Sequence, residues 1–155
     1  MANGDYANAS NFSTSVWYTC AYAGVSGTGK TITVVLSGTP GFFYGGAIQM
    51  TGNTTTGTGC NDGYNHNQST SSGTAVTSNT ITTTNTHDLL VGLMGNNTGG
   101  TTSAGTDGQG NSMTLRMDRA GVTDITTFSE TATNTYSAAM TISSSKWNGM
   151  VMAFK

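Results

Sequence analysis

The sequence is dominated by stretches in which threonine or serine alternates with an apolar residue. In residues 31–37 (TITVVLS), Ile32, Val34 and Leu36 are expected to face inward and the hydroxyl side chains to face solvent. A period of two residues is that of a half-buried strand, because successive side chains of a strand point to opposite faces. No comparable stretch shows the 3.6-residue period of a helix. The pattern therefore predicts an all-β fold.

Composition supports this prediction and excludes several classes of protein. The chain has 31 threonines among 155 residues, and only 8% of its residues are charged. An average soluble domain has about 25% charged residues, whereas β-branched threonine suits a pleated, half-solvated surface. The five Lys and Arg residues are too few for a nucleic-acid-binding surface. No apolar run reaches the ~18 residues that a membrane span needs. We therefore expect no nucleic-acid partner and no membrane span.

Turn-forming residues divide the chain into about nine strands, expected at residues 14–22, 31–37, 42–50, 74–84, 88–94, 112–118, 123–130, 134–142 and 147–154. Residues 1–12 are expected to form an irregular arm, and residues 51–73 and 95–111 to form long polar loops. Closely spaced strands of this kind predict one antiparallel two-sheet β-sandwich domain over residues 1–155. Its core is expected to contain Ile32, Val34, Leu36, Leu89, Val91, Leu93, Leu115, Met140 and Val151.

Cys20 and Cys60 fit one disulfide, which would enclose about 41 residues and contribute up to ~4 kcal/mol in the chain-entropy model. Two buried thiols are the alternative. A zinc site is not expected, because neither cysteine has a second ligand at zinc-finger spacing.

The low charge and the many hydroxyl and amide side chains favour an extracellular or cell-surface location. The chain opens without the basic start and apolar stretch of a signal peptide. Glycosylation is possible at the N-x-S/T sequons if the host modifies them. The five sequons begin at Asn8, Asn11, Asn53, Asn67 and Asn96.

Several stretches resemble a known domain. The run VWYTCAYAGVSGTGKTITVVLSGT…YGGAIQMTGN resembles the middle strands of the jelly-roll, concanavalin-like β-sandwich of bacterial secreted and surface proteins. The runs TTTNTHDLLVGLM and TNTYSAAMTISSSKWNGMVMAFK resemble its second half, so the likeness covers roughly residues 14–155. The resemblance implies a jelly-roll-like sandwich that lacks at least one N-terminal strand, because members usually begin with further strands. Their functions are mostly unassigned.

No constellation of catalytic residues is found in the sequence. Glu130 is the single glutamate, and the paired carboxylates of sandwich glycosidases are absent. His66 and His87 could pair with Asp62 or Asp88, but no nucleophile motif accompanies them. We therefore predict a protein that is not an enzyme, with no catalytic residue and no cofactor.

The sequence predicts neither a calcium site nor an isopeptide cross-link. Calcium binding is conceivable at residues 62–67 and 107–111, but each loop supplies one carboxylate where Ca²⁺ needs several charged oxygens. An isopeptide cross-link, found in some surface sandwiches, needs a buried lysine, an acid or amide partner and a nearby carboxylate. Lys30 and Lys146 lie at expected strand edges, where solvent exposure is the ordinary state.

Tyr64 is the best candidate for an exposed aromatic residue that contacts a ligand, because it lies in a polar stretch with no packing pattern. The sequence favours a non-enzymatic structural subunit of an extracellular or surface assembly, such as a filament, surface layer or virion. Copies would form a homo-oligomer or polymer through strand contacts, which the missing strand favours. The alternative, favoured by the long loops, is a carbohydrate- or ligand-binding module of a larger surface protein.

Overall fold

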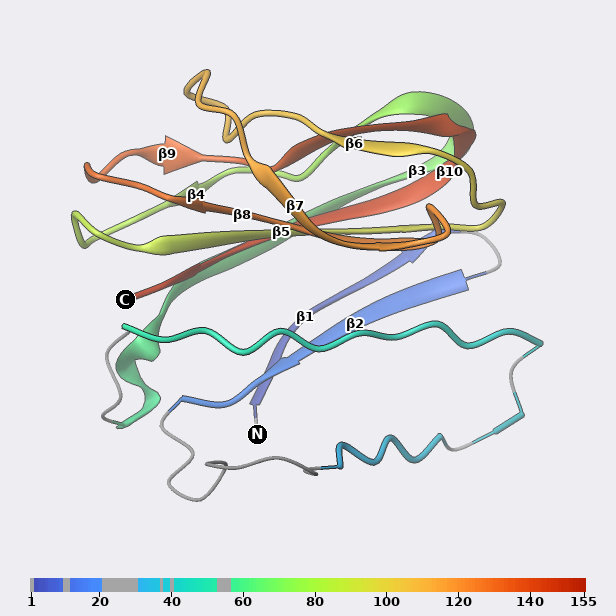
Figure 1. Cartoon of the computed structure of the whole chain (residues 1–155), viewed down its shortest axis with the longest axis horizontal. Helices are drawn as coiled ribbons and strands as arrows, with labels where there is room; N and C mark the ends of the chain where they lie inside the picture. Colours follow the sequence, from blue (N-terminus) through green and yellow to red (C-terminus); the bar gives the residue numbers. More distant parts are fainter. Residues whose placement is uncertain (1, 10–11, 21–30, 37, 40, 53–56) are drawn as a thin grey trace.

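The structure, a computed structural model, describes residues 2–9, 12–20, 31–36, 38–39, 41–52 and 57–155 (Figure 1). Its elements in chain order are β1 (Ala2–Ala9), β2 (Phe12–Tyr18), the 3-10 helix η1 (Gly57–Cys60), β3 (Asn61–Thr77), β4 (Ile81–Thr82), β5 (Leu89–Asn96), β6 (Thr102–Ala104), β7 (Thr114–Arg119), β8 (Thr123–Ser129), β9 (Thr135–Tyr136) and β10 (Ala139–Phe154). Every strand pair among the described residues is antiparallel. The all-β, sandwich-like fold class predicted from the threonine alternation is confirmed.

The strands form one large sheet with smaller units on its two sides. The large sheet has the order β3-β10-β5-β8-β7, and β6 also pairs with β10. The β1–β2 hairpin packs on one side, where β1 contacts β3 and β10. The short β4–β9 pair lies on the opposite side of the large sheet (Figure 1). The core is thus divided between two faces of one sheet.

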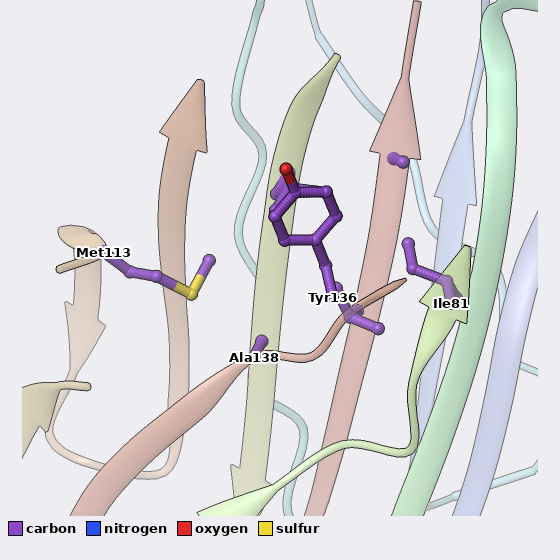
Figure 2. Packing of buried hydrophobic residues seen from close by; sticks show 7 residues of the cluster. Ile81, Met113, Tyr136 and Ala138 are labelled. Carbon is purple, nitrogen blue, oxygen red and sulfur yellow. The ribbon is translucent and has the colours of Figure 1, made fainter. Parts of the chain in front are cut away.

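The central strand β10 shows how the sequence builds both faces. Its last five residues, 150–154, are consecutive apolar residues and none is more than 5% exposed. Because side chains alternate along a strand, Val151 and Ala153 join one cluster, with Ile81, Leu90, Met113, Tyr136 and Ala138 (Figure 2). Met152 and Phe154 join the other, with Cys60, Val91 and Ile125. Val16 and Tyr18 of the hairpin cover this second cluster.

The predicted core is partly confirmed. Met140 and Val151 are buried, as is Val91. Leu89 and Leu93 share the face of Val91, as expected, but both are only half-buried, as is Leu115. Leu90 on the opposite face of β5 is the fully buried leucine. An apolar strand in the middle of a sheet has two buried faces, so alternation alone does not identify its inner side.

Two predicted strands are wrong for the described residues. No strand is assigned within residues 31–36 or 41–50. Ile32, Val34 and Leu36, expected in the core, are 65%, 59% and 46% exposed. Alternation indicates that one face of a segment favours burial. The segment is buried only where another part of the chain packs against that face. Among the described residues, no strand pairs with residues 31–36.

Two segments expected to be irregular are strands. The N-terminal arm forms β1, which pairs with β2 from Ala2↔Tyr18 to Ala9↔Phe12. Most of the expected loop 51–73 forms β3, which pairs with β10 along its length. The shorter strand β6 also lies inside the expected loop 95–111. Backbone hydrogen bonds hold these strands, and their polar side chains give no apolar alternation from which to predict them.

Candidate functional site

The most exposed apolar surface lies in the segment between β2 and η1. The residues from Thr31 to Gly52 include no Asp, Glu, Lys or Arg. The large apolar side chains that the structure exposes here are Ile32, Val34, Val35, Leu36, Phe42, Phe43 and Tyr44, with exposed fractions from 43% to 87%. Single exposed apolar residues are ordinary, whereas seven of them within residues 32–44 are a candidate interaction surface. We call these seven residues the apolar strip.

The end of the same segment is attached to the sheet. Ile48 and Met50 are partly buried against the cluster that contains Val91 and Met152. Residues 48–51, Leu89, Arg116 and Thr127 line a cavity of about 370 Å³. The segment therefore rests on the sheet at residues 48–50, while residues 31–36 and 42–44 present their side chains to solvent.

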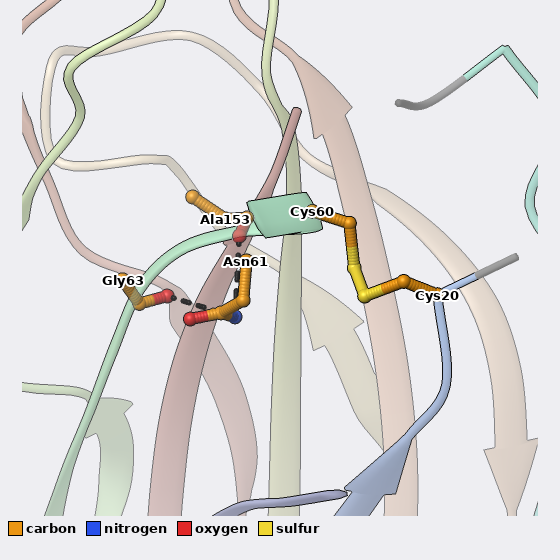
Figure 3. The surroundings of a disulfide bond; sticks show 5 residues. All are labelled: Cys20, Cys60, Asn61, Gly63 and Ala153. Carbon is orange, nitrogen blue, oxygen red and sulfur yellow. Dashed lines mark hydrogen bonds between the residues drawn. A yellow bond between two sulfur atoms is a disulfide. The ribbon is translucent and has the colours of Figure 1, made fainter. Parts of the chain in front are cut away.

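The disulfide fixes the two flanks of this segment. Cys20 follows β2, Cys60 ends η1, and their sulfurs are bonded, with the two Cα atoms 5.9 Å apart (Figure 3). The disulfide predicted from the sequence is thus confirmed, in place of two buried thiols. A disulfide is typical of an oxidising compartment. Next to the disulfide, the side-chain amide nitrogen of Asn61 donates to the backbone carbonyl of Ala153 at 3.3 Å (Figure 3).

A cluster of acidic residues lies where β3 begins and β10 ends. Asp62 forms a salt bridge with Lys155 at 2.8 Å and accepts hydrogen bonds from the amide and hydroxyl of Thr84. Burial raises the pKa of Asp62, but the bonds from Lys155 and Thr84 outweigh it and hold that pKa well below its usual range. Asp62 therefore pairs with a lysine that the sequence pattern does not point to.

Asp88 and Glu130 complete this acidic cluster. Burial, and in addition the neighbouring Asp62, raise the pKa of Asp88 to about 6. The backbone amide of Asp88 donates to Glu130 Oε1 at 2.9 Å. The side-chain amide nitrogen of Asn85 donates to Asp88 Oδ1 at 3.0 Å. Burial and the Glu130 carboxylate raise the pKa of the Tyr136 hydroxyl, which contacts Glu130 Oε2 at 3.3 Å.

The two candidate calcium loops have their carboxylates occupied by protein groups. Asp62 is bound as described. Asp107 accepts bonds from the amides of Gln109 and Asn111 at 2.9 and 3.0 Å, and from the Asn111 side chain at 2.8 Å. Across the described part of the chain, no three His, Cys, Asp or Glu residues are grouped to hold a metal ion.

The remaining sequence candidates are separate from one another. Tyr64 is 50% exposed but lies in strand β3 rather than in a loop. Asn96 is 3% exposed, and its side-chain amide nitrogen, which would carry the glycan, donates to the Gly121 carbonyl. This sequon is therefore not accessible for glycosylation in the folded chain. Asn67 donates to the Thr77 carbonyl at 3.1 Å, and Asn8 lies in β1. The sequons at Asn11 and Asn53, like Lys30, lie outside the described residues.

Comparisons with known proteins do not extend these findings. No family model, no curated protein and no solved structure matches the sequence. The jelly-roll resemblance therefore stays a prediction. Among the described residues, no helix is long and apolar enough to cross a membrane.

Proposed function

We propose that this protein is a non-enzymatic structural subunit of an extracellular or surface assembly, in which copies join through strand contacts. The observation that carries the proposal is the apolar strip within residues 31–44. Burial of one large apolar side chain is worth about 1.5–3 kcal/mol, so covering several of them stabilises an assembly. No described strand pairs with residues 31–36, so their backbone N–H and C=O groups add a template for strand pairing.

Two features favour another copy of the chain as the partner. Natural sheets protect exposed edges with charged residues, especially lysine, and residues 31–52 contain none. The alternation of residues 31–36 is also self-complementary, because an antiparallel pair of identical segments centred on Val34 places Ile32 opposite Leu36 and Val34 opposite its copy. A formal net charge of −2 imposes little repulsion between copies.

The test is the concentration dependence of size for the full chain, by sedimentation velocity and electron microscopy. Val35 is 87% exposed, so Val35→Lys removes no internal packing but places a charge in the apolar strip. Thr133→Lys adds the same charge at an exposed turn elsewhere. We expect the wild type and Thr133→Lys to assemble and Val35→Lys to remain monomeric. A wild type that is monomeric at every concentration, or Val35→Lys assembling normally, contradicts the proposal.

A ligand-binding module is the second candidate, favoured by two exposed aromatic residues. Trp17 on β2 is 60% exposed and Tyr64 on β3 is 50% exposed. Flat aromatic faces can stack on sugar rings. A concentration-independent monomer whose tryptophan fluorescence changes on addition of a glycan would favour this alternative over the structural subunit.

A further inference from the structure

The last residue of the chain is held against the start of a distant strand. Lys155 Nζ lies 2.8 Å from Asp62 Oδ1. The lysine backbone is also fixed there, because its amide donates to the Cys60 carbonyl at 2.8 Å. The Asp62 side chain is 3% exposed and that of Lys155 is 33% exposed. An amine and a carboxyl group are therefore in contact at a site that is largely closed to water on the carboxyl side.

A second carboxyl group faces this pair with incomplete hydrogen bonding. Asp88 is fully buried, and its Oδ2 has no hydrogen-bond donor among the described residues. Its carboxyl group interacts directly with that of Asp62. A buried polar atom left without a partner is rare and calls for an explanation. The salt bridge alone does not provide one, because Lys155 pairs with Asp62 and not with Asp88.

We propose that Lys155 and Asp62 form an intramolecular isopeptide bond and that Asp88 is the catalytic residue of this cross-linking. The acid and the neighbouring carboxyl group are buried, as such a bond needs, and the lysine, which is 33% exposed, brings its Nζ to the acid from the edge of the site. The bond would join the end of β10 to the start of β3, two strands that already pair from Phe154↔Asn61 onward. This inference is independent of the assembly proposed above.

The reaction balances without any co-reactant. The Lys155 ammonium group gives one proton to the Asp62 carboxylate that it contacts, which leaves a neutral amine with a free electron pair and a neutral acid. Nζ then attacks Cγ of Asp62, and the N–Cγ bond forms. Asp88 takes one proton from the newly bonded nitrogen and gives it to the Asp62 hydroxyl oxygen, so that the C–O bond breaks and this oxygen departs as water. The sum is an ammonium and a carboxylate converted into an amide and one water molecule, with Asp88 regenerated.

The surroundings support both roles of Asp88. Its pKa, raised by burial to about 6, makes it a stronger base than an ordinary carboxylate while it stays ionised at neutral pH. Contact with Asp62 raises the pKa of Lys155, so the ammonium form predominates and the loss of its proton is the slow step. Holding the reacting groups together compensates, since effective molarities in well-oriented pairs reach about 10⁵–10⁸ M.

The test is the intact mass of the full chain, denatured and reduced after prolonged incubation of the folded protein. We expect the wild type to be lighter than its sequence mass by one water molecule. Lys155→Arg keeps the positive charge beside Asp62 but cannot form this amide, and Asp88→Asn removes the base at nearly constant size. Both variants should show the full mass, with circular dichroism confirming that they fold.

Peptide mapping locates the bond. Trypsin cleaves after Lys30, Arg116 and Lys146, so a cross-linked chain should yield residues 147–155 joined to the peptide that contains Asp62. A wild type with full mass, or a free 147–155 peptide from a chain that has lost water, overturns the proposal. A cross-link that persists in Asp88→Asn overturns the role of Asp88.

Discussion

Asp118 and Asp124 lie directly opposite each other in the β7–β8 pairing, the first exposed and the second fully buried. Asp124 Oδ2 accepts a hydrogen bond from the Thr102 hydroxyl at 2.7 Å, and its Oδ1 accepts one from the Arg119 amide at 3.1 Å. Burial raises the pKa of Asp124 to about 6, and the neighbouring Asp118 adds to the increase. Between about pH 4 and pH 6, the folded chain therefore holds a proton on Asp124 that the unfolded chain releases.

This pair predicts that acidification stabilises the protein. An unfolded aspartate titrates near 3.9, so the stabilisation is complete below about pH 4 and is lost as pH rises through about 6. We expect Asp124 to raise the free energy of unfolding between pH 7.5 and 5 by on the order of 1–2 kcal/mol, and Asp88, whose pKa is also raised to about 6, to add an increase of the same sign. Urea denaturation at several pH values measures this change.

A variant isolates the contribution of Asp124. Asp124→Asn resembles the protonated acid, so its unfolding free energy should depend less on pH between 5 and 7.5 than that of the wild type. Asp118→Asn removes the neighbouring charge and should also reduce the dependence. An unchanged pH dependence in both variants would show that the pair does not titrate as described.

The β7–β8 turn offers a stabilising substitution. Ala120 and Gly121 have φ angles of 53° and 64°, and the Val122 amide donates to the Arg119 carbonyl at 3.0 Å. A left-handed backbone costs a residue with Cβ about 1–2 kcal/mol, and Asn-Gly is the preferred pair in such turns. Ala120→Asn should therefore raise the unfolding free energy by ~0.5–1 kcal/mol, measured by chemical denaturation. Gly121→Ala should lower it, because a Cβ at this position meets the Gly100 carbonyl.

The disulfide should contribute measurably to stability. Cys20 and Cys60 are separated by 40 positions, and a loop of this size is worth about 2–4 kcal/mol. We expect the double variant Cys20→Ala, Cys60→Ala to lose that amount in urea denaturation, with no further change on adding reductant. Alkylation of native wild type without reductant should label neither cysteine, and labelling of both would contradict the bond.

A pair of leucines tests the burial of β5. Leu90 is 0% exposed, whereas Leu93 is half-buried. Leu90→Ala should cost ~2–5 kcal/mol, the usual loss for a fully buried leucine. Leu93→Ala should cost clearly less, because its side chain already contacts solvent. Equal losses in the two variants, measured by denaturation, would show that the two faces of β5 are equally covered.

Strands with a strong apolar signal could be predicted from the sequence. β5 and the end of β10 could be predicted from their dense apolar runs, which the structure places in the middle of the large sheet. β1 and β3 could not be predicted, since backbone pairing holds them and their side chains are mostly polar. The strand expected at residues 31–37 shows the opposite case, in which the pattern is present and the pairing partner is absent from the described chain.

The acidic cluster could be predicted least. The lysines that the sequence offers for a cross-link are Lys30 and Lys146, whereas the structure brings Lys155 to Asp62, whose carboxyl group interacts with that of Asp88. Which residues meet depends on the pairing of β3 with β10, and the register of a polar strand is not encoded in local periodicity. The cysteines are a partial exception, because there were only two of them to pair.

The most direct test of the proposed assembly is amide hydrogen exchange of residues 31–36 at low and high protein concentration. If copies join through these residues, their amides should exchange rapidly in the dilute chain and become protected as the concentration rises. The amides of β5 should stay protected throughout and provide the internal reference. Rapid exchange of residues 31–36 at every concentration would contradict the account.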